Sequence, residues 1–294
     1  MIELAPEVRT ALDAGKAVVA LETTLVAHGF PAGEGLEVAL EAERRVRDAG
    51  AVPATVGVLD GLVRVGLSPA ELERFAEAGD SARKAGPRDL AVCVAKRVLG
   101  ATTVGGNLAA SAAAGIRVLG TGGIGGVHRG FAERPDISAD LGELTRTPAF
   151  VVASGVKSLL DVPATLEALE TLGVPVLGWQ TETLPLFYSA AGGPPVPATV
   201  TNAAEAAAIA RAHWTLGCGG LLLANPPADS LEVEPLVEAA LAEARSTSVV
   251  GQAVTPFVLA RIHEATGGAS IRVNKRLIAD NAALAAEVAV AYSA

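Results

Sequence analysis

Aromatic residues and cysteines are scarce in this 294-residue sequence. Phe, Trp and Tyr together make up 3% of the chain while half of all residues are apolar, so the core must be built mainly from Ala, Val, Leu and Ile. The two cysteines, Cys93 and Cys218, lie far apart and in no metal-ligand spacing. We therefore expect no disulfide framework, and a reducing, cytoplasmic environment.

Long hydrophobic runs and an excess of basic residues are also missing. No apolar stretch reaches the roughly 18 residues of a membrane-spanning helix, and the amino-terminal segment lacks the basic start and apolar block of a signal peptide. The 23 basic residues are outnumbered by 32 acidic ones, and the net charge of −9 argues against a nucleic-acid partner. A small anionic substrate is compatible with this charge, because it needs only a few local cations and N–H groups.

Apolar blocks alternate with amphipathic segments, which predicts alternating strands and helices. Asp60-Gly61 predicts a hairpin turn within residues 54–65, and Ser68-Pro69-Ala70-Glu71 is a capping box that starts a helix. Buried strands are expected at residues 16–21, 116–119, 149–153, 175–177 and 220–224. Further helices are expected at 35–49, 88–99, 109–114, 138–145, 163–172 and 203–214, and in three segments from residue 234 onward. The pattern predicts one α/β domain over residues 1–294, with helices on both sheet faces and ligands at the carboxyl ends of strands.

A glycine-rich loop follows the strand expected at residues 116–119. Residues 120–125 (GTGGIG) match the G-x-G-x-x-G pattern of dinucleotide-binding proteins. That fingerprint needs a helix to open within the loop, but residues 126–130 (GVHRG) have no apolar helical period. A plain glycine turn is one alternative. We favour another, a loop whose backbone N–H groups approach an anionic ligand.

Lysine is rare in this chain, with five residues against 18 arginines. Lys157 follows the apolar block AFVVA (149–153), at the strand end where active sites collect. A lysine flanked by apolar walls can lose its proton and act as a nucleophile that forms a Schiff base. The alternative is a solvated lysine in the first turn of a helix.

Carboxylates lie at two further positions of interest. Glu22 ends the first buried strand, where burial would favour its protonated form and allow it to act as a general acid. It could equally cap a helix or pair with an arginine. Asp136 and Asp140 lie four residues apart and carry the oxygen ligands that hard cations prefer. From spacing alone, a helix N-cap with an acidic first turn explains them better.

Histidines and hydroxyl residues supply more candidates. His28 and His128 lie in glycine-containing loops after strands and could contact a substrate, whereas His213 and His263 fall on predicted helices. The four histidines form no zinc-ligand pattern. Residues 102–107 (TTVGGN) precede a predicted helix, where hydroxyl and N–H groups suit either a phosphate or plain helix capping.

Taken together, these segments resemble the pseudouridine-5′-phosphate glycosidases, also known as the indigoidine synthase A-like family. The most specific match is TGGIGGVHRG (121–130) followed by DISADL (136–141). The resemblance runs from about residue 17 to residue 292 and is also carried by ALETTLVAHG (20–29), GAVPATVGVLDG (50–61), RDLAVCVA (88–95), GATTVGGN (100–107), SGVKSLLD (154–161), GVPVLGWQT (173–181), GLLLANP (220–226) and TPFVLARI (255–262).

The resemblance implies both a structure and a reaction. The expected structure is a three-layer α/β/α fold around a mixed sheet, assembled as a homotrimer. The expected reaction is the reversible cleavage of pseudouridine 5′-phosphate to uracil and ribose 5-phosphate, with a divalent cation that is typically Mn²⁺. At the matching positions the resemblance implies Lys157 as the nucleophile, Glu22 as the proton donor and Asp136 as the metal ligand. The substrate-binding residues that we expect on the same grounds are Lys84, Val104, Ser138, Ala139 and Asp140, to which we add Thr103, His128 and Asn281.

The sequence departs from the family pattern at Thr23, where serine is common, and at Gly105-Gly106-Asn107, where bulkier or hydroxyl residues are common. These positions flank the expected phosphate region, so they bear on affinity rather than on the chemistry. Two other functions fit the residues. One is a class I aldolase-like lyase that acts on another phosphosugar through Lys157, and the other is a non-catalytic phosphosugar-binding module. The presence of both Glu22 and Lys157 argues against the second.

Overall fold

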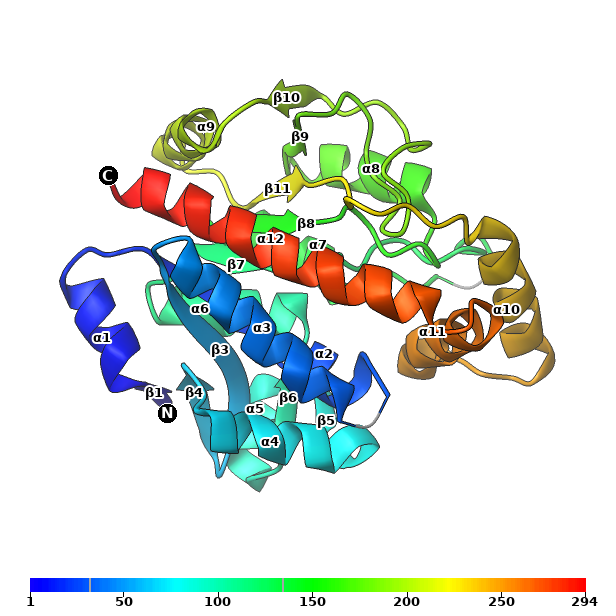
Figure 1. Cartoon of the computed structure of the whole chain (residues 1–294), viewed down its shortest axis with the longest axis horizontal. Helices are drawn as coiled ribbons and strands as arrows, with labels where there is room; N and C mark the ends of the chain where they lie inside the picture. Colours follow the sequence, from blue (N-terminus) through cyan, green and yellow to red (C-terminus); the bar gives the residue numbers. More distant parts are fainter. Residues whose placement is uncertain (32, 134) are drawn as a thin grey trace.

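The computed structural model describes residues 1–31, 33–133 and 135–294, and a mixed β-sheet forms its centre (Figure 1). The strands follow the order β1-β4-β3-β2-β7-β8-β11-β9-β10, with β6 paired to both β3 and β5. All pairings are parallel except those of β3 with β4 and with β6. The strands are β1 (Ile2–Leu4), β2 (Val18–Glu22), β3 (Val52–Leu59), β4 (Leu62–Val65), β5 (Arg83–Ala85), β6 (Gly100–Thr102), β7 (Val118–Gly120), β8 (Phe150–Ala153), β9 (Val176–Trp179), β10 (Ala198–Val200) and β11 (Leu221–Ala224).

Helices cover both faces of this sheet. They are α1 (Pro6–Asp13), α2 (Thr24–His28), α3 (Glu34–Asp48), α4 (Pro69–Ala78), α5 (Leu90–Lys96), α6 (Val104–Ala113), α7 (Ala139–Arg146), α8 (Val162–Thr171), α9 (Ala203–Thr215), α10 (Glu234–Ser246), α11 (Val254–Ala265) and α12 (Ala269–Ser293), with short 3₁₀ turns η1 (Gly79–Ser81) and η2 (Gly251–Ala253). None of the helices formed by the described residues has the length and apolar character to cross a lipid bilayer.

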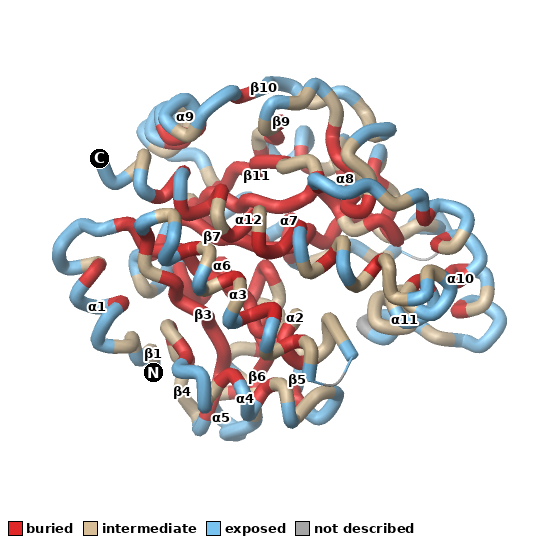
Figure 2. The backbone as a smooth tube through the Cα atoms, viewed as in Figure 1, coloured by how far each residue is buried: buried red, intermediate tan, exposed pale blue. Residues whose placement is uncertain are grey.

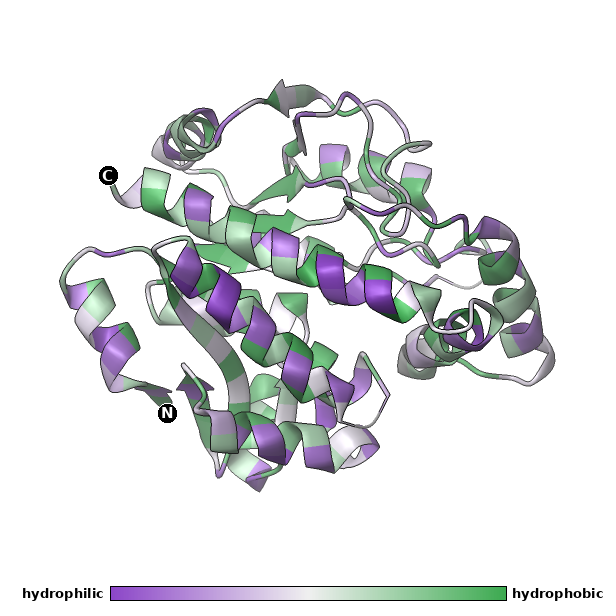
Figure 3. Ribbon diagram, in the orientation of Figure 1, coloured by the Kyte–Doolittle hydropathy of each residue, from purple (hydrophilic) through white to green (hydrophobic). Residues whose placement is uncertain are grey.

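The central strands are buried on both faces, which explains their continuous apolar sequences. Every residue of β2, β7, β8 and β11 is buried. Figure 2 shows this burial concentrated in the middle of the sheet, and Figure 3 shows hydrophobic residues there and hydrophilic ones on the outer faces of α3 and α4.

Helix α12 is the main element of one layer. It lies across β7, β8 and β2 and packs against α3 and α9 (Figure 1). On the other face, α6 packs against α7 and contacts β2 and β3. The arrangement is the three-layer α/β/α fold around a mixed sheet that the sequence resemblance implied.

Most of the predicted elements are confirmed, with shifted boundaries. The capping box at Ser68 forms as predicted, and Asp60 and Gly61 both adopt positive φ, as a tight hairpin turn requires. The helix predicted at 109–114 instead begins at Val104, because the Thr103 side chain accepts a hydrogen bond from the Gly106 N–H and caps it. The helix predicted at 88–99 is confined to Leu90–Lys96.

Close packing of α12 on the sheet depends on small residues, because a Cβ on Gly120 would lie 3.1 Å from the Ala282 Cα and 3.3 Å from the Ala285 Cβ. We expect Gly120→Val to push α12 away and to lower the free energy of unfolding by about 1–3 kcal/mol. Gly142→Ala is the control, since an added Cβ there meets nothing within 4 Å. Denaturant unfolding of both variants tests this, and an unchanged midpoint for Gly120→Val would contradict it.

Candidate active site

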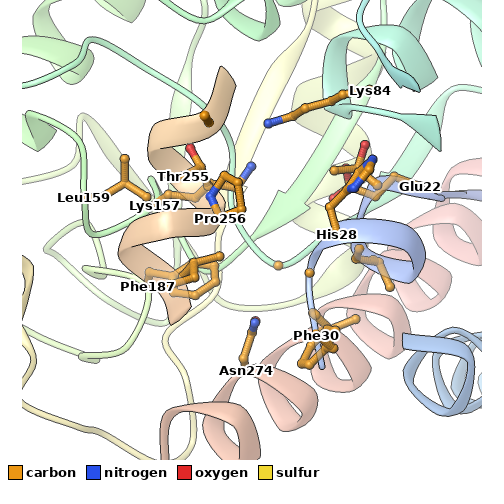
Figure 4. A pocket seen from close by; sticks show the side chains of 18 of the residues that line it. Glu22, His28, Phe30, Lys84, Lys157, Leu159, Phe187, Thr255, Pro256 and Asn274 are labelled. Carbon is orange, nitrogen blue, oxygen red and sulfur yellow. The ribbon is translucent and has the colours of Figure 1, made fainter. Parts of the chain in front are cut away.

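A cavity opens where the strands β2, β7 and β8 end. It has a volume of about 580 Å³, and its lining includes Glu22, Lys84 and Lys157 (Figure 4). A second hollow of about 320 Å³ shares Lys84 and Lys157 with the first and extends to Asp136 and Asp140. The two spaces therefore adjoin at the two lysines.

Glu22 is the last residue of β2 and is only 6% exposed. The Thr121 hydroxyl donates a hydrogen bond to its Oε1 atom. Burial raises the pKa of the Glu22 carboxyl above its ordinary value, and the charge of Lys157 and the Thr121 hydrogen bond oppose this effect only in part. A carboxyl group that keeps its proton to higher pH is suited to act as a general acid.

Lys157 lies in a loop after β8 whose backbone is tightly constrained. Gly155 has a φ of +74°, and a Cβ there would lie 2.2 Å from the Pro185 carbonyl oxygen, so only glycine fits. The Lys157 N–H donates to the Ile124 carbonyl oxygen over 3.1 Å. Figure 4 shows the Lys157 side chain reaching into the cavity from the side opposite Glu22.

Arg129 holds the turn that follows Lys157. Its Nε and Nη2 atoms donate to the carbonyl oxygens of Leu160 and Ser158, over 3.2 and 2.9 Å. Its Nη1 atom forms an ion pair with Glu234, at the start of α10, at 2.6 Å. The guanidinium thus ties the Lys157 loop to a neighbouring helix.

Lys84 is the middle residue of β5 and is half-buried. Burial lowers the pKa of its ammonium group, and so does the nearby charge of Lys157, while Asp140 and Glu22 act in the opposite direction. Two lysines and a carboxyl group that influence one another's pKa values at one cavity are the kind of cluster found at catalytic sites.

Asp140 connects two loops that are distant in sequence. It is 4% exposed, and its two carboxylate oxygens accept hydrogen bonds from the N–H groups of Gly105 and Gly125, each over 2.8 Å. Asp140 lies in the first turn of α7. Ser138 is the N-cap of this helix, because its hydroxyl accepts a hydrogen bond from the Asp140 N–H. Ser138, Ala139 and Asp140 all line the smaller hollow.

His128 and Asp136 face the smaller hollow from a short antiparallel pairing, in which the His128 N–H donates to the Asp136 carbonyl oxygen over 3.0 Å. Burial lowers the pKa of the His128 imidazole, and the Asp136 carboxylate opposes that shift. The glycine-rich loop before them opens no helix, as the sequence predicted, and its Gly125 N–H instead binds Asp140.

Of three further residues expected at the site, Thr103 lies in a cavity wall, whereas Val104 and Asn281 do not. Thr103 lines the smaller hollow and caps α6, whereas the Val104 side chain is buried and lines neither cavity. The Asn281 side chain is fully buried on α12, where its Nδ2 donates to the Thr121 carbonyl oxygen over 2.8 Å. Its Oδ1 accepts from Asn225 over 2.9 Å, so Asn281 ties together the loops after β7 and β11 beneath the cavity.

The cavity also contains residues that the sequence analysis did not single out. Phe187 has a φ of +64°, which is unusual for a bulky residue. Its ring lies so close to Gly123 that a Cβ at that position would be 2.6 Å from the ring. Asn274 lines the cavity from α12, and Thr121 contacts Glu22. No local signal marks Phe187 or Asn274, because each reaches the site only through the tertiary fold. Thr121, by contrast, is the first residue of the segment TGGIGGVHRG that carries the family resemblance.

The geometry defines a class of site. A lysine amine and a carboxyl group whose pKa is raised by burial face each other across a cavity at the carboxyl ends of parallel strands, beside a second lysine and backbone N–H groups. Such a site is equipped for nucleophilic and acid–base chemistry on a small anionic molecule.

Comparison with known proteins places the chain in a family. The model of the indigoidine synthase A-like proteins matches residues 7–291, so the chain belongs to this family. It is 49% identical to the pseudouridine-5′-phosphate glycosidase of Chloroflexus aurantiacus, over 100% of this chain and 99% of that protein. It is 51% identical to the protein of the same name from Salinispora tropica, over 98% and 91% of the two chains.

Solved structures show the same fold. One is the prealnumycin C-glycosynthase AlnA in complex with ribulose 5-phosphate, with a TM-score of 0.91 and 38% identity. Another is an indigoidine synthase A-like protein from Thermotoga maritima, with a TM-score of 0.90 and 37% identity. Each alignment covers 100% of this chain and 97% of the other.

The raised pKa of Glu22 predicts how its replacement changes stability with pH. The folded protein binds this proton more tightly than the unfolded chain, so the wild type loses stability as pH rises from about 4.5, the usual carboxyl value, through the raised pKa. Glu22→Gln does not titrate, so its melting temperature should rise relative to wild type over that range. Thermal unfolding at a series of pH values tests this, and parallel curves for the two proteins would contradict it.

Proposed function

We propose that this chain reversibly cleaves the carbon–carbon glycosidic bond of pseudouridine 5′-phosphate, giving uracil and ribose 5-phosphate. The observation that carries the proposal is the placement of Glu22 and Lys157 on opposite sides of one cavity. The names of the relatives support it, as does the sugar phosphate bound by the structurally similar C-glycosynthase.

The bond to be broken explains why this pair is needed. Uracil is joined to ribose through carbon, so the base must leave with the electron pair of a C–C bond. A paired-carboxylate glycosidase is poorly suited to that, because it relies on a leaving group bound through a heteroatom. A lysine supplies an electron sink at C1′, and a protonated carboxyl group supplies the proton that the leaving carbon needs.

The proposed steps use Lys157 and Glu22. The Lys157 amine attacks C1′ and the bond from C1′ to the ring oxygen breaks. The proton that the attached nitrogen releases passes to that oxygen as the ribose opens. The nitrogen lone pair then forms a C=N bond while the C1′–C5 bond breaks, and its electron pair passes to C5 of uracil, which takes the proton of Glu22. Water adds to the iminium carbon and the C–N bond breaks. This releases ribose 5-phosphate, restores the Lys157 amine and returns a proton to the Glu22 carboxylate.

In this proposal, Lys84 and neighbouring residues bind the phosphate of the substrate. The protein carries a net charge of −9, so local groups must offset its repulsion of a phosphate. Lys84 and Thr103, the N-cap residue of α6, both line the smaller hollow. Their contacts would supply binding energy remote from the reacting bond.

A divalent cation fits this site as an ion bound largely through water. Among the described residues, no three His, Cys, Asp or Glu side chains cluster to form a protein cage. The Asp136 carboxylate is half-exposed on the smaller hollow, with His128 beside it. One carboxylate with water and substrate oxygens is a common arrangement for a small hard cation. When bound by Asp136, the cation would supply positive charge and ordered water near the sugar hydroxyl groups.

The direct test of the proposed function is incubation of pseudouridine 5′-phosphate with the protein and Mn²⁺, with products identified by mass. Uracil and ribose 5-phosphate in equal amounts are expected, and the reverse reaction should rebuild the substrate from them. Cleavage of a base-free sugar phosphate at a carbon–carbon bond, without release of uracil from the nucleotide, would favour an aldolase-like lyase instead.

Removal of the Lys84 ammonium should weaken substrate binding. We expect Lys84→Ala to raise KM for pseudouridine 5′-phosphate by the equivalent of about 1.5–3 kcal/mol, the value of a charge-assisted hydrogen bond. The slow cleavage of unphosphorylated pseudouridine should change little. Lys96→Ala, which removes an exposed lysine on α5, is the matched control. Equal loss with both substrates would place Lys84 at the ribose or in the chemistry.

Replacement of Asp136 should alter the response to metal. Asp136→Ala should require far more Mn²⁺ for half-maximal activity than wild type, while its affinity for inorganic phosphate stays similar. Asp13→Ala, an exposed aspartate at the end of α1, serves as control. Full activity of metal-stripped wild type, checked by metal analysis, would count decisively against the cation.

A further inference from the structure

The loop that carries Lys157 forms part of the wall of two separate hollows. Lys157, Ser158 and Leu159 line the larger cavity of the site (Figure 4). Ser158 also lines a hollow of about 860 Å³ outside the site, together with Leu160 and Arg129. The loop backbone therefore lies between the site and this outer hollow, and its position depends in part on the partners of its polar groups.

Arg129 donates hydrogen bonds to two carbonyl groups of this loop. Its Nη2 atom donates to the Ser158 oxygen over 2.9 Å, and its Nε atom donates to the Leu160 oxygen over 3.2 Å. Ser158 and Leu160 are both buried, and neither lies in a helix or a strand. A buried carbonyl group that loses its donor is costly, so removal of the guanidinium should make the loop shift toward another donor.

The orientation of the guanidinium is itself fixed by an ion pair. The Nη1 and Nη2 atoms of Arg129 donate to the two carboxylate oxygens of Glu234, over 2.6 and 3.0 Å. Two parallel bonds orient the planar group in a way that a lysine ammonium cannot reproduce. Arg129 is not among the described residues that line the larger cavity or the smaller hollow, so its side chain does not reach a substrate held there.

We propose that Arg129 is a positioning residue for Lys157, an inference that rests on the proposed function. The Leu160 N–H donates to the Lys157 carbonyl oxygen over 3.0 Å and closes a turn over residues 157–160. The guanidinium binds the second and fourth residues of this turn and so fixes where the Lys157 side chain begins. Attack on C1′ needs the amine aligned at about 3–3.5 Å, so a small shift of the turn slows bond formation more than it weakens substrate binding.

The expected signature is a fall in kcat without a matching rise in KM. Arg129→Ala should lower kcat for pseudouridine 5′-phosphate by about ten- to a hundredfold, the range of a sub-ångström to ångström misplacement, while KM changes little. The rate at which borohydride traps ribose 5-phosphate on Lys157 should fall in proportion. Glu234→Gln, which keeps the guanidinium but weakens its anchor, should give a smaller loss of the same kind. Arg44→Ala, which removes an exposed, ion-paired arginine on α3, is the matched control and should change neither value.

Chemical rescue separates positioning from a general loss of structure. The outer hollow borders Arg129, so a small planar cation can enter the space that Arg129→Ala leaves. Added guanidinium, well below denaturing concentrations, should restore part of kcat in Arg129→Ala, whereas ammonium at the same ionic strength should not. Arg129→Lys keeps the charge but lacks the fork, so its kcat should stay low.

An unchanged kcat and trapping rate in Arg129→Ala would overturn the inference. A loss that guanidinium does not restore and that raises KM equally would assign Arg129 a general structural role instead. If Arg129→Ala does not fold, Glu234→Gln decides, and an unchanged kcat there counts against the inference. Wild type that traps ribose 5-phosphate on Lys157 but cleaves no pseudouridine 5′-phosphate would refute the proposed substrate alone, because the trapping rates still test Arg129. Absence of any wild-type adduct on Lys157 would refute both.

Discussion

The buried carboxylate of Asp140 determines the geometry of the site. By accepting the N–H groups of Gly105 and Gly125, it fixes the start of α6 and the glycine-rich loop after β7 relative to each other. Gly125 must be glycine, because a Cβ there would lie 2.2 Å from the Ser138 hydroxyl oxygen. The neighbouring Ile124 carbonyl oxygen accepts a hydrogen bond from the Lys157 N–H, so the loop that Asp140 holds also positions the backbone of Lys157, the proposed nucleophile.

Burial of polar groups gives the site its reactivity at a cost in stability. The same desolvation that raises the pKa of Glu22 lowers the pKa of Lys84, so both groups are shifted toward their neutral forms. The left-handed backbone of Phe187 is a local strain in the same cavity wall. The Oδ1 atom of Asn274, which has no hydrogen-bond partner among the described residues, adds a further cost.

The sequence predicted the regular parts of the fold well and the tertiary parts poorly. Long apolar blocks located β2, β8 and β11, because a strand buried on both faces must be apolar throughout. The start of α6 was missed, since Gly105 and Gly106 have low helix propensity and the helix begins there through the Thr103 cap and the contact with Asp140. The short strands β5 (RKA) and β10 (ATV) carry too little apolar pattern to be recognised, whereas the equally short β7 was found because it lies in an apolar block.

The candidate site shows the same difference between what a local sequence pattern predicts and what depends on the tertiary fold. Glu22 and Lys157 could be found from their places after apolar blocks and from the family resemblance. The role of Asn281 beneath the cavity and the place of Asn274 in the cavity wall depend on how α12 crosses the sheet, which no local pattern encodes.

The central claim is that Lys157 forms a Schiff base with the sugar phosphate. Reduction with borohydride in the presence of ribose 5-phosphate tests this claim most directly. Peptide mass analysis should find the reduced sugar phosphate on Lys157 and none in Lys157→Ala, whereas an adduct on Lys84 or Lys275 would contradict the account.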